Sequence, residues 1–139
     1  MTDISYHVVT DIPVDTVVEL YQAGGWWKED PKGRQLIPRM VQGSFCFMVA
    51  QEGDRVVGMG RAISDGHSDA YIQDVVVLKS HRGHGIGGVL VKRLAEHCAD
   101  AGLVWIGLVA EPGTTPFYEH LGFKPLKDYQ PMLYQGKKP

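Results

Sequence analysis

The strongest constraint on the fold is a change of sequence pattern near the middle of the chain. An apolar run, Val75-Val76-Val77-Leu78, leads into the segment Lys79–Gly88, in which four of the last six residues are glycine. Apolar residues then recur at helical spacing: Ile86, Val89, Leu90, Leu94 and Cys98. The run is typical of a strand covered on both faces, and the later spacing is typical of an amphipathic helix. The chain therefore contains a predicted strand, glycine loop and helix in direct succession.

The rest of the chain predicts a mixed arrangement of strands and helices. We expect strands over 4–9, 45–50, 55–63, 71–78, 104–110 and 132–134. We expect a helix opening near residues 11–13, a broken helix over 33–41, and a short helix over 115–121. Turns are predicted at 51–54 and 64–68, and a loose tail at 136–139. This order indicates a single α/β (α+β) domain over 1–139, in which the strand segments 75–78 and 104–110 are expected to be parallel neighbours joined by a crossover helix.

Length and composition exclude several classes of protein. A chain of 139 residues suits one domain, and 14 basic against 16 acidic residues argue against a nucleic-acid partner. No apolar run approaches the roughly 20 residues of a membrane span, and the first residues lack the pattern of a signal peptide. Cys46 and Cys98 lack disulfide or metal-ligand spacing, so we expect buried thiols and no metal. These features predict a cytoplasmic protein without a membrane partner.

The glycine loop is typical of a phosphate site, because it places free backbone N–H groups at the start of a helix. Gly83, Gly85 and Gly88 fit the dinucleotide pattern GxGxxG, but four residues separate the loop from its strand and no acidic residue follows at the required distance. Gly83 and Gly88 also have P-loop spacing, yet Val89 and Leu90 stand where lysine and a hydroxyl residue are needed. A loop that uses glycine only to turn is a further alternative.

A third phosphate-binding pattern, Arg82-x-x-Gly85-x-Gly87, resembles the pyrophosphate loop of the GNAT acetyltransferases. The segment 117–123 resembles a later GNAT motif, in which a tyrosine stands near the coenzyme sulfur. Residues 61–65 with 74–77 are similar to small GNAT proteins grouped with plastid serotonin acetyltransferases, and 74–88 to glucosamine-6-phosphate acetyltransferases. The resemblance covers roughly 44–135. It implies the GNAT fold, a mixed central sheet of about six to seven strands flanked by helices and splayed at the cofactor strand.

By this resemblance the co-substrate is acetyl-CoA. The backbone N–H groups from His84 to Gly88 would hold its pyrophosphate, while Arg82 and Lys79 meet phosphate charge. A bulge in the strand at 75–77 would leave backbone groups free for the pantetheine arm. The implied cofactor-binding residues are Val75, Val76, Val77, Arg82, Gly83, His84, Gly85, Ile86, Gly87, Gly88, Thr114 and Phe117. Thr114 departs from the family pattern, since many relatives have asparagine there.

The resemblance also implies direct acetyl transfer to an amine, which needs a proton acceptor. An amine with a pKa near 10.4 is neutral in only about one molecule in 2,500 at pH 7. Asp74 is our candidate base because it precedes the cofactor strand; the alternative is a structural carboxylate. Some relatives carry glutamate beside this position, where this chain has Gln73. The other candidate bases are Asp65, Glu111 and His120.

Tyr118 is the second predicted catalytic residue. A phenol pKa of about 10 lies above that of a thiol, so a hydrogen bond to the developing sulfur charge is easier than full proton donation. The alternative is an aromatic ring that packs against the cofactor. A backbone N–H near Val76 would serve the carbonyl oxygen. Tyr21, Trp26 and Trp27 are expected either to wall the acceptor pocket or to belong to the core.

Three functional hypotheses follow from the sequence. The first is an acetyl-CoA-dependent N-acetyltransferase acting on the primary amine of a small molecule. The second is a protein lysine or N-terminal acetyltransferase, which needs an open peptide groove. The third is a non-catalytic module that binds acetyl-CoA as a sensor. A homodimer is implied by the family resemblance alone.

Overall fold

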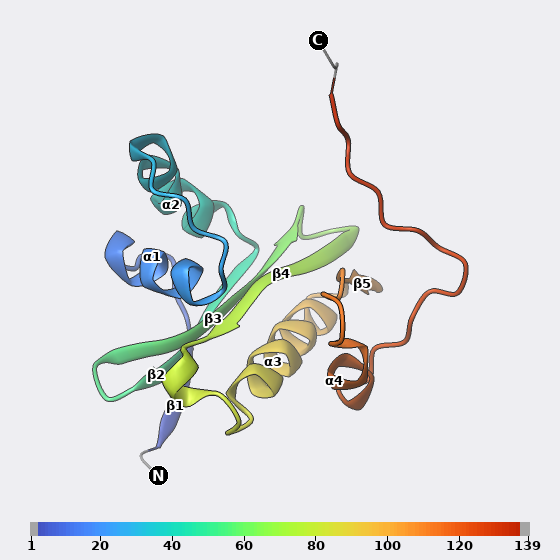
Figure 1. Ribbon diagram of the computed structural model, residues 1–139. Coiled ribbons are helices and arrows are strands. Elements are labelled where there is room, and N and C mark those ends of the chain that lie inside the picture. The colour runs from blue at the N-terminus through green and yellow to red at the C-terminus, as the bar shows by residue number, and fades with distance from the viewer. Residues whose placement is uncertain (1–2, 137–139) are drawn as a thin grey trace. The chain divides into compact units, whose positions relative to one another are not determined.

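A computed structural model describes residues 3–136 and divides into two compact units at Leu108–Val109 (Figure 1). Residues 1–2 and the last three residues of the expected loose tail, 137–139, lie outside the described residues. The first unit carries nearly all of the regular structure.

The first unit is built on a five-stranded mixed sheet with the order β1-β2-β3-β4-β5. Its strands are β1 (Ile4–Val8), β2 (Cys46–Glu52), β3 (Arg55–Ser64), β4 (Asp69–Val77) and β5 (Trp105–Gly107). Strands β1 to β4 pair with one another antiparallel in succession. Strand β5 runs parallel to β4, as the sequence predicts, but it pairs with residues 69–71 of β4 and not with the predicted 75–78. The mixed α/β class is confirmed, although the described residues form five strands rather than six to seven.

Helices cover both faces of this sheet (Figure 1). They are α1 (Val14–Ala23), α2 (Pro31–Gly43), the 3₁₀ turn η1 (Lys79–His81) and α3 (Ile86–Asp100). On β3, Gly58 and Gly60 face α3, where an added Cβ would lie 3.1 Å from Leu90 Cδ1 and 2.8 Å from Leu94 Cδ1. Because side chains alternate along a strand, Arg61 points to the opposite face, which α1 covers. The two glycines thus let α3 pack closely on the sheet.

Helix α2 is longer than the sequence predicts. It begins at Pro31, where Asp30 accepts a hydrogen bond from the Lys32 N–H at 3.1 Å, and it continues through Pro38 to Gly43. A proline at the first helical position needs no N–H partner, which favours this start. The helix was expected to be broken, but Pro38 lies inside it.

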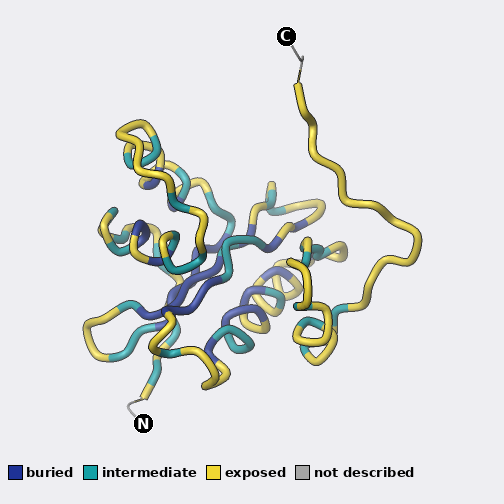
Figure 2. Tube along the Cα trace, in the orientation of Figure 1, coloured by how far each residue is buried: buried dark blue, intermediate teal, exposed yellow. Residues whose placement is uncertain are grey.

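The hydrophobic core lies on both faces of the sheet, against α1 on one and against α3 on the other (Figure 2). Phe47, Leu90 and Leu94 are among its fully buried side chains. Cys46 and Cys98 are free and buried, which confirms the expected thiols, and burial raises the pKa of Cys46 to about 11. No helix within residues 3–136 is long and apolar enough to cross a membrane.

The second unit contains one short helix among its described residues, α4 (Thr115–His120). The predicted strand at 132–134 is wrong: no strand forms there, and the three side chains are 87–90% exposed. Pro131 lacks a backbone N–H, and the segment has no partner strand among the residues described. The predicted strand 104–110 is reduced to the three residues of β5.

Candidate active site

A β-bulge interrupts β4 beside the candidate base. The pairing between β3 and β4 passes from Met59 opposite Val76 to Arg61 opposite Gln73, so Asp74 and Val75 both stand against Gly60. Asp74 takes a positive φ of 59°, a conformation that aspartate tolerates better than most residues. Bulges change the direction of a strand and re-aim its side chains. The bulge that the family resemblance implies is therefore present.

The same strand separates from its parallel neighbour. Residues Asp69, Ala70 and Tyr71 of β4 pair with β5, and within the described residues no strand pairs with the rest of that edge. Backbone groups along 72–77 on the β5 side are thus left without a ladder partner. Val75, Val76 and Val77, the predicted cofactor strand, lie in this separated part of β4.

The Asp74 carboxylate is held by two side chains on the α1 face of the sheet. Arg61 Nε and the Tyr21 hydroxyl both donate to Asp74 Oδ2, each at 2.8 Å. The side chains of Arg61 and Asp74 are 12% and 21% exposed. Within the described residues Asp74 Oδ1 makes no hydrogen bond. The carboxylate is thus fixed through one oxygen, and the other remains available to a ligand.

Burial and the Asp74 carboxylate both raise the pKa of Tyr21 well above its usual value. Its phenol therefore remains a hydrogen-bond donor at any assay pH. The ring of Tyr21 stacks on Trp27 with centroids 6.3 Å apart, and it meets Trp26 edge-on at 6.1 Å. The three aromatic side chains expected near the acceptor thus form one cluster, connected to Asp74 through Tyr21. Trp26 is 41% exposed, so this cluster is not wholly core.

The glycine loop opens α3 in a conformation that requires glycine. Gly83 and Gly85 have φ values of 82° and 81°, and an added Cβ at either would meet nothing within 4 Å. Positive φ, rather than crowding, is therefore the reason for glycine here. Gly85 is the N-cap of α3 and no side chain caps the helix, so the first N–H groups of α3 are free for an anion.

Arg82 and His81 fasten this loop to the first unit through their side chains. Arg82 donates from Nε to the Val77 carbonyl at 3.0 Å and from Nη2 to the Ala23 carbonyl at 2.9 Å. His81 Nε2 lies 3.1 Å from Glu52 Oε1. The His81 side chain is only 19% exposed. The Arg82–Ala23 and His81–Glu52 contacts join residues 59 and 29 positions apart, which local pattern does not reveal.

The second unit holds Tyr118 on α4. Its ring meets Phe117 edge-on at 5.0 Å and Phe123 at 6.0 Å, and burial together with the Glu111 carboxylate raises the pKa of its phenol. Phe117 is 40% exposed. The Thr114 hydroxyl donates to the Glu111 carbonyl at 2.7 Å. Thr114 is thus already engaged within its own turn.

Asp65 is a poor base for a physical reason. Its carboxylate accepts hydrogen bonds from the backbone N–H groups of His67 and Ser68 at 2.8 Å, and from the Ser68 hydroxyl at 2.9 Å. These bonds lower its pKa to about 2. Asp65 closes the turn between β3 and β4 and has little tendency to accept a proton. Glu111 and His120, the remaining candidate bases, are exposed residues of the second unit.

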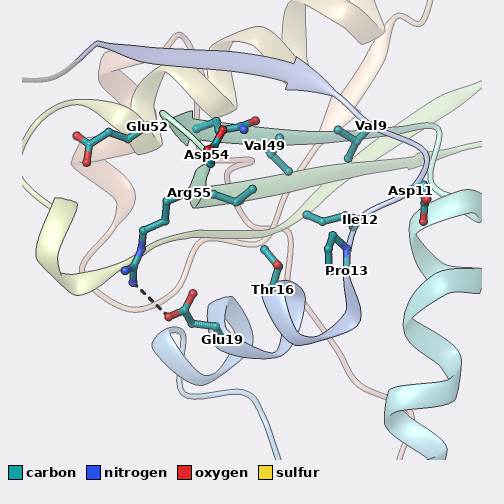
Figure 3. Close-up of a pocket in the computed structure, with 12 residues that line it drawn as sticks. Val9, Asp11, Ile12, Pro13, Thr16, Glu19, Val49, Glu52, Asp54 and Arg55 are labelled. Atoms are coloured by element: carbon teal, nitrogen blue, oxygen red, sulfur yellow. Dashed lines mark hydrogen bonds and ion pairs between the residues drawn. The ribbon is translucent and has the colours of Figure 1, made fainter.

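A pocket of about 640 Å³ lies elsewhere in the first unit, between the start of α1 and the β2–β3 hairpin (Figure 3). Arg55 and Glu19 form an ion pair of 3.2 Å in its wall. Its other ionisable residues are Asp11, Glu52 and Asp54. None of the predicted site residues lines this pocket. Within residues 3–136, no three His, Cys, Asp or Glu side chains gather as a metal site would need.

Comparison with known proteins identifies the family. The sequence pattern of the acetyltransferase (GNAT) family matches residues 14–123, which include parts of both units. The chain belongs to this family. It is 35% identical over 82 residues to the uncharacterized N-acetyltransferase YjcF of Bacillus subtilis (strain 168), a match covering 58% of this chain and 57% of that protein. It is 33% identical over 108 residues to the uncharacterized N-acetyltransferase ycf52 of Porphyra purpurea, covering 76% and 61%.

Solved GNAT structures share the fold. The GNAT family protein SP0256 of Streptococcus pneumoniae TIGR4 superposes with a TM-score of 0.82 and 28% identity, over 98% of this chain and 100% of that one. The matches to the two curated GNAT relatives span only 57% and 61% of their lengths.

Proposed function

We propose that the chain transfers the acetyl group of acetyl-CoA directly to the primary amine of a small molecule. The observation that carries the proposal is the course of β4. This one strand bulges at Asp74, separates from β5, and leads into the uncapped N-terminus of α3. A carboxylate, a free strand edge and an anion site thus follow one another along 74–88.

The glycine loop and the uncapped N-terminus of α3 fit a diphosphate. The free N–H groups from His84 to Gly88 would bind its oxygens, and the positive end of the helix dipole favours their charge. The edge of β4 at 75–77 pairs with no strand among the described residues and offers backbone groups to an amide-containing arm, except for the Val77 carbonyl, which accepts from Arg82 Nε. Gly83, Thr114 and Phe117 complete the predicted cofactor contacts. Acetyl-CoA supplies the acetyl group as a thioester, and the chain binds and orients it.

The α1 side of β4 fits an amine. Asp74 Oδ1 is available to accept the proton that the amine loses, directly or through water, while Arg61 and Tyr21 hold the carboxylate in position. The aromatic cluster of Tyr21, Trp26 and Trp27 supplies apolar surface for the carbon skeleton of the acceptor. A backbone N–H near Val76 would stabilise the charge on the carbonyl oxygen. Tyr118 would hydrogen-bond the departing sulfur.

The remaining expectations complete the proposal. We propose a homodimer, on the family resemblance alone, and a cytoplasmic location, which two free buried thiols suit. Residues 1–139 would form one GNAT domain, since the family match crosses the border between the two units.

The test is a panel of amines assayed with acetyl-CoA by thiol release. The panel contains small aliphatic amines, aromatic amines, amino sugars, and peptides that carry lysine or a free N-terminus. We expect turnover with at least one small amine and none with the peptides. Turnover with peptides alone would support a protein acetyltransferase instead. Acetyl-CoA binding without any turnover would support a sensor.

A further inference from the structure

The arginine that opens the glycine loop is bound to the end of another helix. Arg82 Nη2 donates to the carbonyl of Ala23, the last residue of α1 and 59 positions away, at 2.9 Å. Arg82 Nε donates to Val77 at the end of β4. Two of the guanidinium's donors are therefore occupied by backbone carbonyls. These bonds join the loop, the end of β4 and the end of α1.

The last turn of α1 supplies no cation of its own. The last carbonyls of a helix have no intrahelical partners. A guanidinium at this negative helix end is favourable. The turn that follows is bonded back onto α1, since the N–H groups of Gly24, Gly25 and Trp26 donate to Leu20, Gln22 and Tyr21. Arg82 thus holds the point at which this turn begins.

Ala23, which Arg82 holds, is close in the chain to Tyr21, the residue of α1 that contacts Asp74. Tyr21 precedes Ala23 by two residues on α1, and its hydroxyl donates to Asp74 Oδ2 at 2.8 Å. On the other side, Arg82 directly precedes Gly83, whose positive φ begins the loop. A continuous set of contacts therefore runs from the glycine loop through Arg82 and α1 to the carboxylate.

We infer that Arg82 is a positioning residue that fixes the end of α1 against the glycine loop. A diphosphate bound at the loop then stabilises the arrangement of Tyr21 and Asp74 that receives the amine. The inference rests on the proposed function for its ligands. It gives Arg82 a role distinct from that of a phosphate ligand, which the sequence pattern suggests.

The experiment compares the wild type with Arg82→Gln and the milder Arg82→Lys by amide hydrogen exchange, with and without CoA. In the free protein, protection at Gly24, Gly25 and Trp26 should fall about tenfold in Arg82→Gln, the loss expected for one charge-assisted hydrogen bond. CoA should raise protection there in the wild type and not in the variants. Both variants should bind CoA within about threefold of the wild type, while KM for the amine rises about tenfold.

Arg93→Gln is the matched control. Arg93 lies on α3 with its guanidinium 4.9 Å from the centre of the Tyr6 ring, so it also makes a packing contact, but on the face of the sheet opposite α1. Its loss should leave both the protection at 24–26 and the amine KM unchanged. Melting temperatures of all variants show whether a change at 24–26 is local or global.

Two results would overturn the inference, and a third would refute its ligand-dependent part. CoA affinity that falls tenfold in Arg82→Gln, with protection at 24–26 and the amine KM unchanged, would make Arg82 a phosphate ligand only. Unchanged protection at 24–26 in the free variants would show that Arg82 does not hold α1. Failure of the wild type to bind CoA would refute the proposed function and the coupling together, whereas the free-protein exchange would still decide whether Arg82 positions α1.

Discussion

The glycine loop and the Asp74 network bind through different parts of the chain. The loop offers backbone N–H groups, and its essential residues, Gly83 and Gly85, contribute only a permitted φ. The network around Asp74 is made of side chains, contributed by Tyr21 and Arg61 from two other elements. A backbone site depends on conformation, and a side-chain site depends on long-range packing. A substitution in one site should therefore leave the groups that bind at the other intact, apart from the coupling through Arg82.

The largest effect is expected from Gly85→Asp. A negative side chain at the N-cap of α3 would repel phosphate, and the φ of 81° adds strain of about 1–3 kcal/mol. Affinity for acetyl-CoA, measured by calorimetry, should fall by at least about 100-fold. Gly102→Asp is the matched control, because Gly102 has a φ of 91° and open space at the other end of α3. It should lose similar stability and keep acetyl-CoA affinity; equal loss of affinity in both variants would contradict the assignment.

Asp74→Asn should impair the Asp74 network and leave acetyl-CoA binding at the glycine loop intact. Asparagine tolerates the positive φ and keeps an acceptor oxygen, but it cannot take the amine's proton. We expect kcat/KM for the amine to fall about 10²–10⁴-fold, with a flattened acidic limb and partial recovery at high pH where the free amine is abundant. Asp65→Asn should leave the profile unchanged, because a carboxylate with a pKa of about 2 does not serve as the base. A lower melting temperature with an unaltered pH profile would make Asp74 structural.

Tyr118→Phe should lower turnover less than Asp74→Asn. The raised pKa of this phenol disfavours proton donation, so its role is a hydrogen bond to the sulfur. We expect kcat to fall about 10²-fold, the lower end for such catalysis, while acetyl-CoA affinity is retained. Tyr129→Phe, on an exposed tyrosine of the same unit, is the control. An unchanged kcat in Tyr118→Phe would leave the ring as packing only.

Tyr21→Phe should have the smallest effect. It removes one of the two donors to Asp74 and keeps the stacked ring, so kcat/KM should fall about three- to tenfold, as for one hydrogen bond of about 1 kcal/mol. The pH profile should keep its shape, because the phenol is protonated at every assay pH. Tyr71→Phe, on β4 and without a side-chain hydrogen bond, should show no change. An effect as large as that of Asp74→Asn would mean that Tyr21 itself contacts the amine.

The difference between a site set by local conformation and a site set by long-range packing also explains which parts of the molecule could be predicted from the sequence. The strand, glycine loop and helix at 75–98 were predictable because glycine spacing and apolar period are local properties. The partners of Asp74 and Arg82 were not, since Tyr21 lies 53 residues from Asp74 and Ala23 lies 59 residues from Arg82. The strand predicted at 132–134 failed for a related reason. Apolar residues favour a strand only where a partner edge is available, and among the described residues no strand pairs with 132–134.

The separability of the two sites is tested most directly by calorimetric titration of acetyl-CoA into three proteins. The wild type and Asp74→Asn should bind with the same affinity, whereas Gly85→Asp should show no measurable binding. No binding by the wild type, or a loss in Asp74→Asn as large as that in Gly85→Asp, would contradict the account.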